Sequence, residues 1–109
     1  MKVQIGSMFF DLIFTNKTIL CNNHECYGAI TYDDRLIEIK DKMCEDQTNQ
    51  TIAHEIVHGI MREHCLDELI DPENLEHIVD EFSKGLIQLL RDNPKLIVQL
   101  SKKPQIQSK

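Results

Sequence analysis

Two histidines separated by three residues stand near the middle of the chain, in the segment His54-Glu55-Ile56-Val57-His58. On a helix, residues four apart lie one turn above each other, about 6 Å apart along the axis. Imidazole nitrogens bind Zn²⁺ at about 2.0–2.1 Å, so both side chains can reach one ion across that gap. Glu55 can reach a water bound to the same ion. This His-Glu-x-x-His pattern is typical of zinc metallopeptidases and predicts a Zn²⁺ site with Glu55 as general base.

The residues around this pattern favour a helix. Apolar side chains recur at helical spacing, and the run contains no glycine or proline before Gly59: Ile52, Ala53, Ile56, Val57 and Ile60. Asp46 or Thr48 could cap the helix by accepting a backbone N–H, and the apolar stripe continues to Met61 or Cys65. The alternative interpretation is a pair of surface histidines on an ordinary amphipathic helix.

A catalytic zinc needs a third protein ligand, and His64 is one candidate. It lies six residues after His58, which is the spacing of the third histidine in metzincins. That family has a glycine three residues after the second histidine to turn the chain back, whereas Met61 stands there in this sequence. If the helix continues, His64 lies about 15 Å along its axis from His54 and cannot share the metal.

Glu76 is the other candidate for the third ligand. It lies early in the next predicted helix, beside the apolar stripe of Leu75 and Val79, as a ligand in a helix–helix contact should. Asp80 follows at i+4 on the same helix face and could accept a hydrogen bond from the second ring nitrogen of a ligand histidine. The alternative is that both acids are solvated, since acidic residues favour helix N-termini in any case.

The chain around these residues predicts an α+β fold with a small, mostly antiparallel sheet of about four strands. Residues 3–5 and 8–14 alternate or are rich in β-forming residues, with Gly6-Ser7 as a turn, and residues 28–32 and 36–39 form a second hairpin. Residues 16–27 are interpreted as a loop, with a brief extended or helical piece near residues 18–20. A zinc-binding helix and a supporting helix follow the sheet.

Asp71-Pro72 marks the start of the supporting helix, with a carboxylate at the N-cap and proline at the first helical position. One face of that helix is apolar: Leu75, Ile78, Val79, Phe82, Leu86, Leu89 and Leu90. Asn93-Pro94 ends or kinks it. We expect one domain over residues 1–100 and a polar, disordered tail over residues 101–109.

Composition limits the function classes. The chain has 109 residues, of which 41% are hydrophobic and 28% charged, as in one small globular domain. Its net charge of −6 argues against non-specific nucleic-acid binding, which needs a basic surface. The apolar stretch of residues 8–14 is too short for a membrane span, contains Asp11, and precedes no signal-peptide cleavage site. We therefore expect a cytoplasmic protein that binds neither nucleic acid nor a membrane.

The four cysteines are Cys21, Cys26, Cys44 and Cys65. In the absence of a secretory signal, we interpret them as reduced thiols. Cys21 and Cys26 with His24 between them could bind a second metal, but their spacing is not that of a standard zinc pair, which favours free cysteines in a loop.

The sequence resembles the small phage and prophage zinc peptidases related to the ImmA/IrrE family, roughly from Tyr27 to Leu96. Three stretches carry the resemblance: residues 28–39 (GAITYDDRLIEI) before the zinc helix, residues 51–60 (TIAHEIVHGI) in it, and residues 76–83 (EHIVDEFS) after it. The resemblance implies a minimal zincin-like fold, His54, His58 and Glu76 as zinc ligands, and Glu55 as base. It also implies a bacterial or phage-infected host cell. The chain has no room for the additional domains of longer relatives, and a Cys21–Cys26 loop is not associated with this family.

If the site is complete, zinc activates a water that attacks a peptide bond, while Glu55 takes the proton and passes it to the leaving amine. The cleft is expected between the zinc helix and the edge strand of the sheet, where an extended protein or peptide substrate could add as a strand. A regulatory protein such as a repressor is the substrate that the family analogy suggests. Four residues could stabilise the oxyanion: Tyr27, Tyr32, Arg62 and His77.

Two functions without catalysis are the alternatives. The metal could be structural, with a fourth protein ligand such as a cysteine closing the site. The chain could instead be a zinc-stabilised phage-type protein that binds a host or regulatory protein through the same groove without cutting it. The sequence does not predict an oligomeric state.

Overall fold

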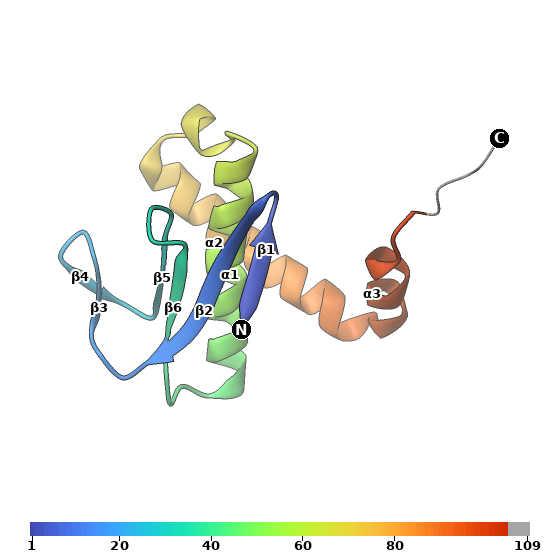
Figure 1. The fold of residues 1–109 in the computed structure, drawn as a ribbon, viewed down its shortest axis with the longest axis horizontal. Coiled ribbons are helices and arrows are strands. Elements are labelled where there is room, and N and C mark those ends of the chain that lie inside the picture. The colour runs from blue at the N-terminus through green and yellow to red at the C-terminus, as the bar shows by residue number, and fades with distance from the viewer. Residues whose placement is uncertain (105–109) are drawn as a thin grey trace.

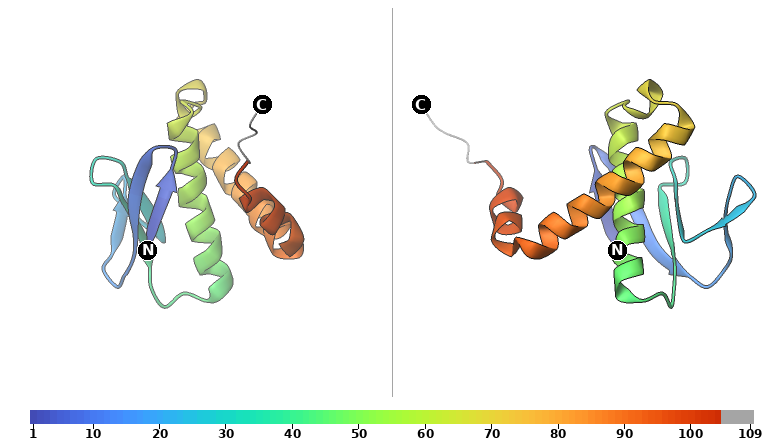
Figure 2. Two further views of the ribbon diagram at one scale, coloured as in Figure 1. Left: turned by 45° about the vertical axis from the view of Figure 1, so that its right-hand side comes forward. Right: turned by 180° about the vertical axis from the view of Figure 1, so that it is seen from behind.

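The structure, a computed structural model, describes residues 1–104. The elements follow in the order β1 (Lys2–Ile5), β2 (Met8–Thr15), β3 (Ile19–Cys21), β4 (His24–Cys26), β5 (Gly28–Thr31), β6 (Leu36–Lys40), α1 (Glu45–Glu63), η1 (Asp67–Leu69), α2 (Pro72–Asp92) and α3 (Pro94–Ser101). A four-stranded sheet, α1 and α2 lie in successive layers (Figures 1 and 2). The predicted α+β class is confirmed.

The main sheet has the strand order β1-β2-β6-β5. Both predicted hairpins are present, because β1 pairs with β2 and β5 with β6 in antiparallel fashion. Gly6, at φ +61°, supplies the left-handed conformation that the tight turn between β1 and β2 needs. The two hairpins are joined through a parallel pairing of β2 with β6, which leaves β5 at one edge of the sheet.

The core lies between the sheet and α1, as the alternating pattern predicts. Every second residue of β2 and β6 points inward, so that Phe10 and Leu12 pack with Ile37 and Ile39. Their neighbours on the outer face stay accessible, and Phe9 is 56% exposed. The sheet is therefore covered by a helix on one face.

The segment predicted as a loop contains a second, two-stranded sheet of β3 and β4. Its turn residues, Asn22 and Asn23, have φ values of +51° and +66°. Two consecutive residues with positive φ characterise a type I′ turn, for which asparagine is well suited. The hairpin stands beside β5 at the edge of the main sheet (Figure 1).

The helix α1 begins two residues earlier than a cap at Asp46 would require. Cys44 occupies the N-cap in an extended conformation, without a side-chain hydrogen bond, and its carbonyl accepts from the Thr48 N–H at 2.9 Å. The expected caps Asp46 and Thr48 are thus wrong, because both residues already lie within the helix. His64 is the C-cap, followed by Cys65 in the left-handed conformation.

The start of α2 is as predicted, with the Asp71 carboxylate accepting the Asn74 backbone N–H at 2.9 Å. The predicted apolar face is only partly correct. Val79 is fully buried, but Phe82 is 62% exposed next to the fully buried Ser83, because the side of α2 that faces α1 is centred on Val79 and Ser83. The second half of α2 extends beyond the sheet and α1 (Figure 2). A face at helical spacing is buried only where another element covers it.

The break predicted at Asn93-Pro94 is present, and α3 follows it. This short helix was not predicted. It ends at Ser101, the first residue of the expected tail, and no helix or strand is found over residues 102–104. The rest of the expected tail, residues 105–109, lies outside the described residues. Within residues 1–104, no helix is both long and apolar enough to cross a membrane.

Candidate metal centre

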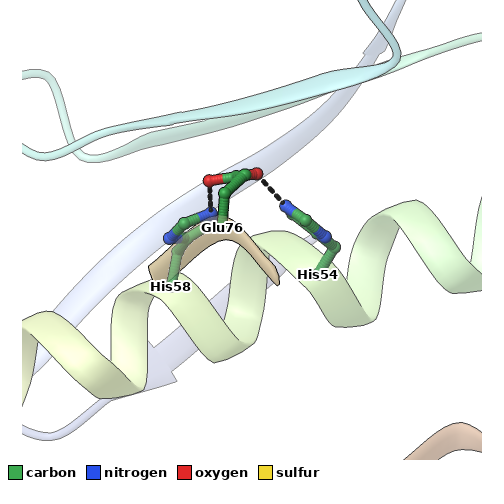
Figure 3. A group of neighbouring side chains, drawn as sticks. All are labelled: His54, His58 and Glu76. Atoms are coloured by element: carbon green, nitrogen blue, oxygen red, sulfur yellow. Dashed lines mark hydrogen bonds and ion pairs between the residues drawn. The ribbon is translucent and has the colours of Figure 1, made fainter. Parts of the chain in front are cut away.

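The helix α1 presents the two predicted ligand histidines on one side. The ring centroids of His54 and His58 are 4.9 Å apart, and each side chain is 18% exposed. This spacing follows from the one-turn separation of residues four apart on a helix. Both rings point toward Glu76 of α2 (Figure 3).

Glu76, on the second turn of α2, completes the group. Its Oε1 lies 2.7 Å from His54 Nε2 and its Oε2 lies 3.0 Å from His58 Nε2, so that the carboxylate bridges the two rings (Figure 3). Within the described part of the chain, these three residues form a group whose ligand atoms all lie within 4.8 Å of one another. Glu76 is therefore brought to the histidines, whereas His64 is not a member of the group.

The donor set fits a zinc ion. Two imidazole nitrogens and a carboxylate oxygen are ligands that Zn²⁺ accepts, and ligand atoms around a tetrahedral zinc are about 3.4 Å apart. A small outward movement of the Glu76 carboxylate would reach that spacing from the present contacts of 2.7 and 3.0 Å. Such a set would leave the fourth tetrahedral position open to water, as in catalytic zinc sites.

Asp80 lies beside His54, as the i+4 spacing from Glu76 predicts. Its Oδ1 is 3.5 Å from His54 Nδ1, while its Oδ2 is 3.1 Å from Lys84 Nζ. The hydrogen bond from Lys84 is the main cause that lowers the pKa of the Asp80 carboxyl, and His54 adds to it. The carboxylate is thus placed to accept the second ring N–H of His54, although 42% of its side chain is exposed.

Glu55 is buried, with 7% of its surface exposed. Burial raises the pKa of its carboxyl to about 7; the neighbouring His54 opposes this effect and the negative charge of Glu76 adds to it. A carboxyl with such a pKa exchanges a proton readily near neutral pH. Its burial was not apparent from the sequence, in which Glu55 lies among polar and apolar neighbours alike.

His58 also differs from a solvated histidine. Burial lowers its pKa from the ordinary value and outweighs the opposite effect of the Glu76 charge. The neutral imidazole, which is the form that binds a metal, is therefore favoured at neutral pH.

These groups line one cleft with a volume of about 690 Å³. Its walls come from α1, the start of α2, the edge strand β5 and the β3–β4 hairpin. The cleft thus lies between the helix of the two histidines and the edge strand, as predicted.

Of the four residues expected as oxyanion donors, Tyr27 and Tyr32 line the cleft. The Tyr32 hydroxyl donates to the His58 carbonyl at 3.3 Å, and the Arg62 guanidinium stacks 4.5 Å from the centre of the Tyr32 ring. Arg62 is not among the residues that line the cleft. His77 is exposed on α2 and is not among the cleft-lining residues.

Cys21 and Cys26 also line the cleft, and their position was missed. The signal that could have placed them is Asn22-Asn23, a turn dipeptide between short runs of β-forming residues. All four cysteines, each within the described residues, are free thiols in the structure.

Searches with the chain found no matching protein-family model, no matching curated protein and no matching solved structure.

Proposed function

We propose that the protein is a zinc-dependent endopeptidase. The observation that carries this proposal is the convergence of His54, His58 and Glu76, with ligand atoms within 4.8 Å of one another, in a cleft that also contains the buried Glu55. Two helices bring the three ligands together. This arrangement, together with the sequence resemblance to ImmA/IrrE-related peptidases, supports zinc as the metal and peptide hydrolysis as the reaction.

The residues of the cleft each have a defined part in the proposed reaction. A zinc ion bound by the three side chains would polarise a peptide carbonyl and acidify the attacking water. Glu55 accepts the proton of that water and delivers it to the leaving amine, and its pKa of about 7 suits both transfers. Asp80 holds the His54 ring in orientation through its Nδ1. Tyr27 is the candidate donor to the developing oxyanion, because the hydroxyl proton of Tyr32 is donated to the His58 carbonyl.

The position of β5 supports an extended peptide as the substrate. Because β5 is the edge strand of the sheet and lines the cleft, a segment of another protein can add to it as a strand. Unfolded or loop segments can adopt this conformation more readily than folded ones. We propose a regulatory protein such as a repressor as the substrate and the cytoplasm of a bacterial or phage-infected cell as the location, by analogy with the resembled family.

The replacement Glu55→Gln tests the proposal. The variant keeps the shape of the side chain but cannot take a proton, so it should retain about one zinc per chain and lose hydrolysis of a denatured protein substrate by a factor on the order of 10² or more. Glu45→Gln, on an exposed residue in the first turn of the same helix, is the matched control and should remain active.

Zinc content is measured by elemental analysis, and cleavage is followed by mass spectrometry of the products. Equal cleavage by the Glu55→Gln variant and the parent would refute the assignment of the base. A parent protein that binds zinc and cuts no peptide would favour the alternative of a zinc-stabilised protein that binds a partner without cutting it.

A further inference from the structure

The β3–β4 hairpin places two thiols side by side in the wall of the cleft. Cys21 pairs with His24 and Ile19 pairs with Cys26, and side chains of directly paired residues share one face of a sheet. Cys21 and Cys26 are therefore diagonal neighbours on the same face. Both are partly buried, and both line the cleft that contains the metal centre.

The Cys26 thiol raises the pKa of Cys21, as expected for a neighbouring thiol on the same face of the hairpin. Two-stranded ribbons twist more strongly than larger sheets, which shortens one of the two diagonals between paired strands. The strands β3 and β4 have three residues each and form a sheet of their own, so a small movement of the hairpin breaks no strand pairing of the main sheet. Such a movement can bring the Cβ atoms to the 3.5–4.5 Å that a disulfide requires.

The proposed hydrolysis uses neither thiol. The group of candidate metal ligands in the described chain consists of His54, His58 and Glu76, without a sulfur atom. Burial, the neighbouring Cys26 and the charges of Glu55 and Glu76 raise the pKa of Cys21 to about 12, so that Cys21 remains a neutral thiol. Its S–H donates to the carbonyl of Gly28 on β5 at 3.7 Å.

We propose that Cys21 and Cys26 are a redox-active dithiol, which a low-molecular-weight disulfide converts into a reversible intramolecular disulfide in the wall of the cleft. This inference rests on the placement of the hairpin and does not depend on the proposed peptidase activity.

The reaction proceeds by two thiol–disulfide exchanges. Cys26 loses its proton and attacks one sulfur of the small disulfide, whose S–S bond breaks and releases one small thiol. Cys21 then loses its proton and attacks Cys26 Sγ, and the mixed S–S bond breaks and releases the second small thiol. The two cysteines are oxidised and the small disulfide is reduced to two thiols. The first step removes the charge of Cys26 that opposes ionisation of Cys21, which helps the second step.

Oxidation should stiffen the hairpin. The bond closes a short loop from Cys21 to Cys26, which restricts the opening of the two three-residue strands. It also removes the S–H that donates to Gly28. Amide hydrogen exchange in β3 and β4 should therefore slow by about tenfold or more in the oxidised protein, without a comparable change in α2.

The test uses the full chain with Cys44→Ser and Cys65→Ser, incubated with oxidised glutathione. We expect free thiols to fall from two to none, the mass to fall by two hydrogens, the protein to stay monomeric, and dithiothreitol to restore both thiols. Peptide mapping should identify a Cys21–Cys26 link. Proteins that retain two thiols, or that carry glutathione on both cysteines, would overturn the proposal.

The complementary variant, Cys21→Ser with Cys26→Ser, is the matched control. It keeps Cys44 and Cys65, which are both exposed and lie at opposite ends of α1, about 30 Å apart along the helix axis. These thiols cannot bridge within one chain and should accumulate glutathione adducts or intermolecular disulfides instead. If this control loses two hydrogens as a monomer as readily as the test variant, the proposed pairing is wrong.

Discussion

At the scale of single residues, Glu76 is one of the two candidate third ligands that the sequence left open. Because its two oxygens contact Nε2 of both histidines, Glu76→Ala should weaken zinc binding well over tenfold. His64→Ala should leave the affinity nearly unchanged, since His64 caps α1 outside the group. A zinc titration against a chromophoric chelator measures both. Equal losses would favour His64 as the third ligand.

Asp80 offers a second residue-scale prediction. The carboxylate lies 3.5 Å from His54 Nδ1 and 42% of its side chain is exposed, so a water molecule can replace it as the acceptor of the ring N–H. Asp80→Ala should therefore weaken zinc binding by about tenfold, and Asp80→Asn, whose carbonyl can still accept, by less. The same chelator competition applies.

Glu81→Gln is the control for Asp80. Glu81 also pairs with Lys84, at 2.9 Å, but has no contact with either histidine among the ion pairs of residues 1–104. Its replacement should leave the zinc affinity unchanged. An equal effect of the Glu81 and Asp80 variants would assign the loss to Lys84 and not to the orientation of His54.

The pKa of Glu55 predicts how the stability of the metal-free protein depends on pH. Because the folded value of about 7 exceeds the ordinary 4.5, the folded state binds the proton more tightly, and stability falls as pH rises from about 4.5 to 7. Glu55→Gln removes this cost. The variant should be more stable than the parent at pH 8, by on the order of 3 kcal/mol, and equal to it below about pH 4. Urea unfolding in the presence of a chelator measures this difference, and a constant difference across pH would contradict the buried carboxyl.

The sequence predicts this site in part. His54, Glu55 and His58 follow from one local pattern, because i,i+4 geometry is the same on every helix. Glu76 required the packing of α2 against α1, a contact across 18 or more residues that spacing alone could not distinguish from a solvated acid. The position of Cys21 in the wall of the cleft depends on the β3–β4 hairpin, whose sequence contains only weak signals for strands and a turn.

At the scale of elements, replacing each of two helix glycines with alanine should change the stability of the protein in opposite directions. A Cβ on Gly59 in α1 would lie 2.6 Å from Ile5 Cδ1 and 3.2 Å from Ile30 Cδ1, whereas one on Gly85 in α2 would meet nothing within 4 Å. Gly85→Ala should stabilise the protein by about 0.5–1 kcal/mol. Gly59→Ala should destabilise it by about 1 kcal/mol, because crowding exceeds the gain in helix propensity. Urea unfolding measures both, and stabilisation by both variants would contradict the close approach of α1 to the sheet.

The elements themselves were largely predictable where their signals are local. Alternation defined the two hairpins, and Asp71-Pro72 defined the start of α2. The parallel pairing of β2 with β6 joins segments separated by more than 20 residues, and no local pattern encodes it. The exposed part of the apolar face of α2 could not be predicted either, because helical periodicity does not specify which other element covers that face.

At the scale of the whole molecule, the metal centre and α3 are separate. Within residues 1–104, α2 is the element against which α3 packs closely. No residue of α3 lines the cleft of the candidate metal centre. A chain that ends at Asn93 should therefore bind zinc with an affinity within about twofold of the parent. A chain that ends at Pro104 is the control for shortening as such. A loss of binding in the shorter chain alone would show that α3 supports the centre.

The two ends of the segment that contains the β3–β4 hairpin meet the main sheet at one residue of β6. Thr15, at the end of β2, pairs with Lys40 of β6, and the Lys40 N–H donates to the Tyr27 carbonyl at 2.8 Å on the other side of the same strand. Both ends of residues 16–27 are thus held about two strand spacings apart, roughly 10 Å. A segment anchored in this way can be lengthened, shortened or exchanged at little entropic cost. Insertions and deletions during evolution can therefore reshape this wall of the cleft, and with it the choice of the proposed peptide substrate, while the helices that carry the candidate metal ligands stay unchanged.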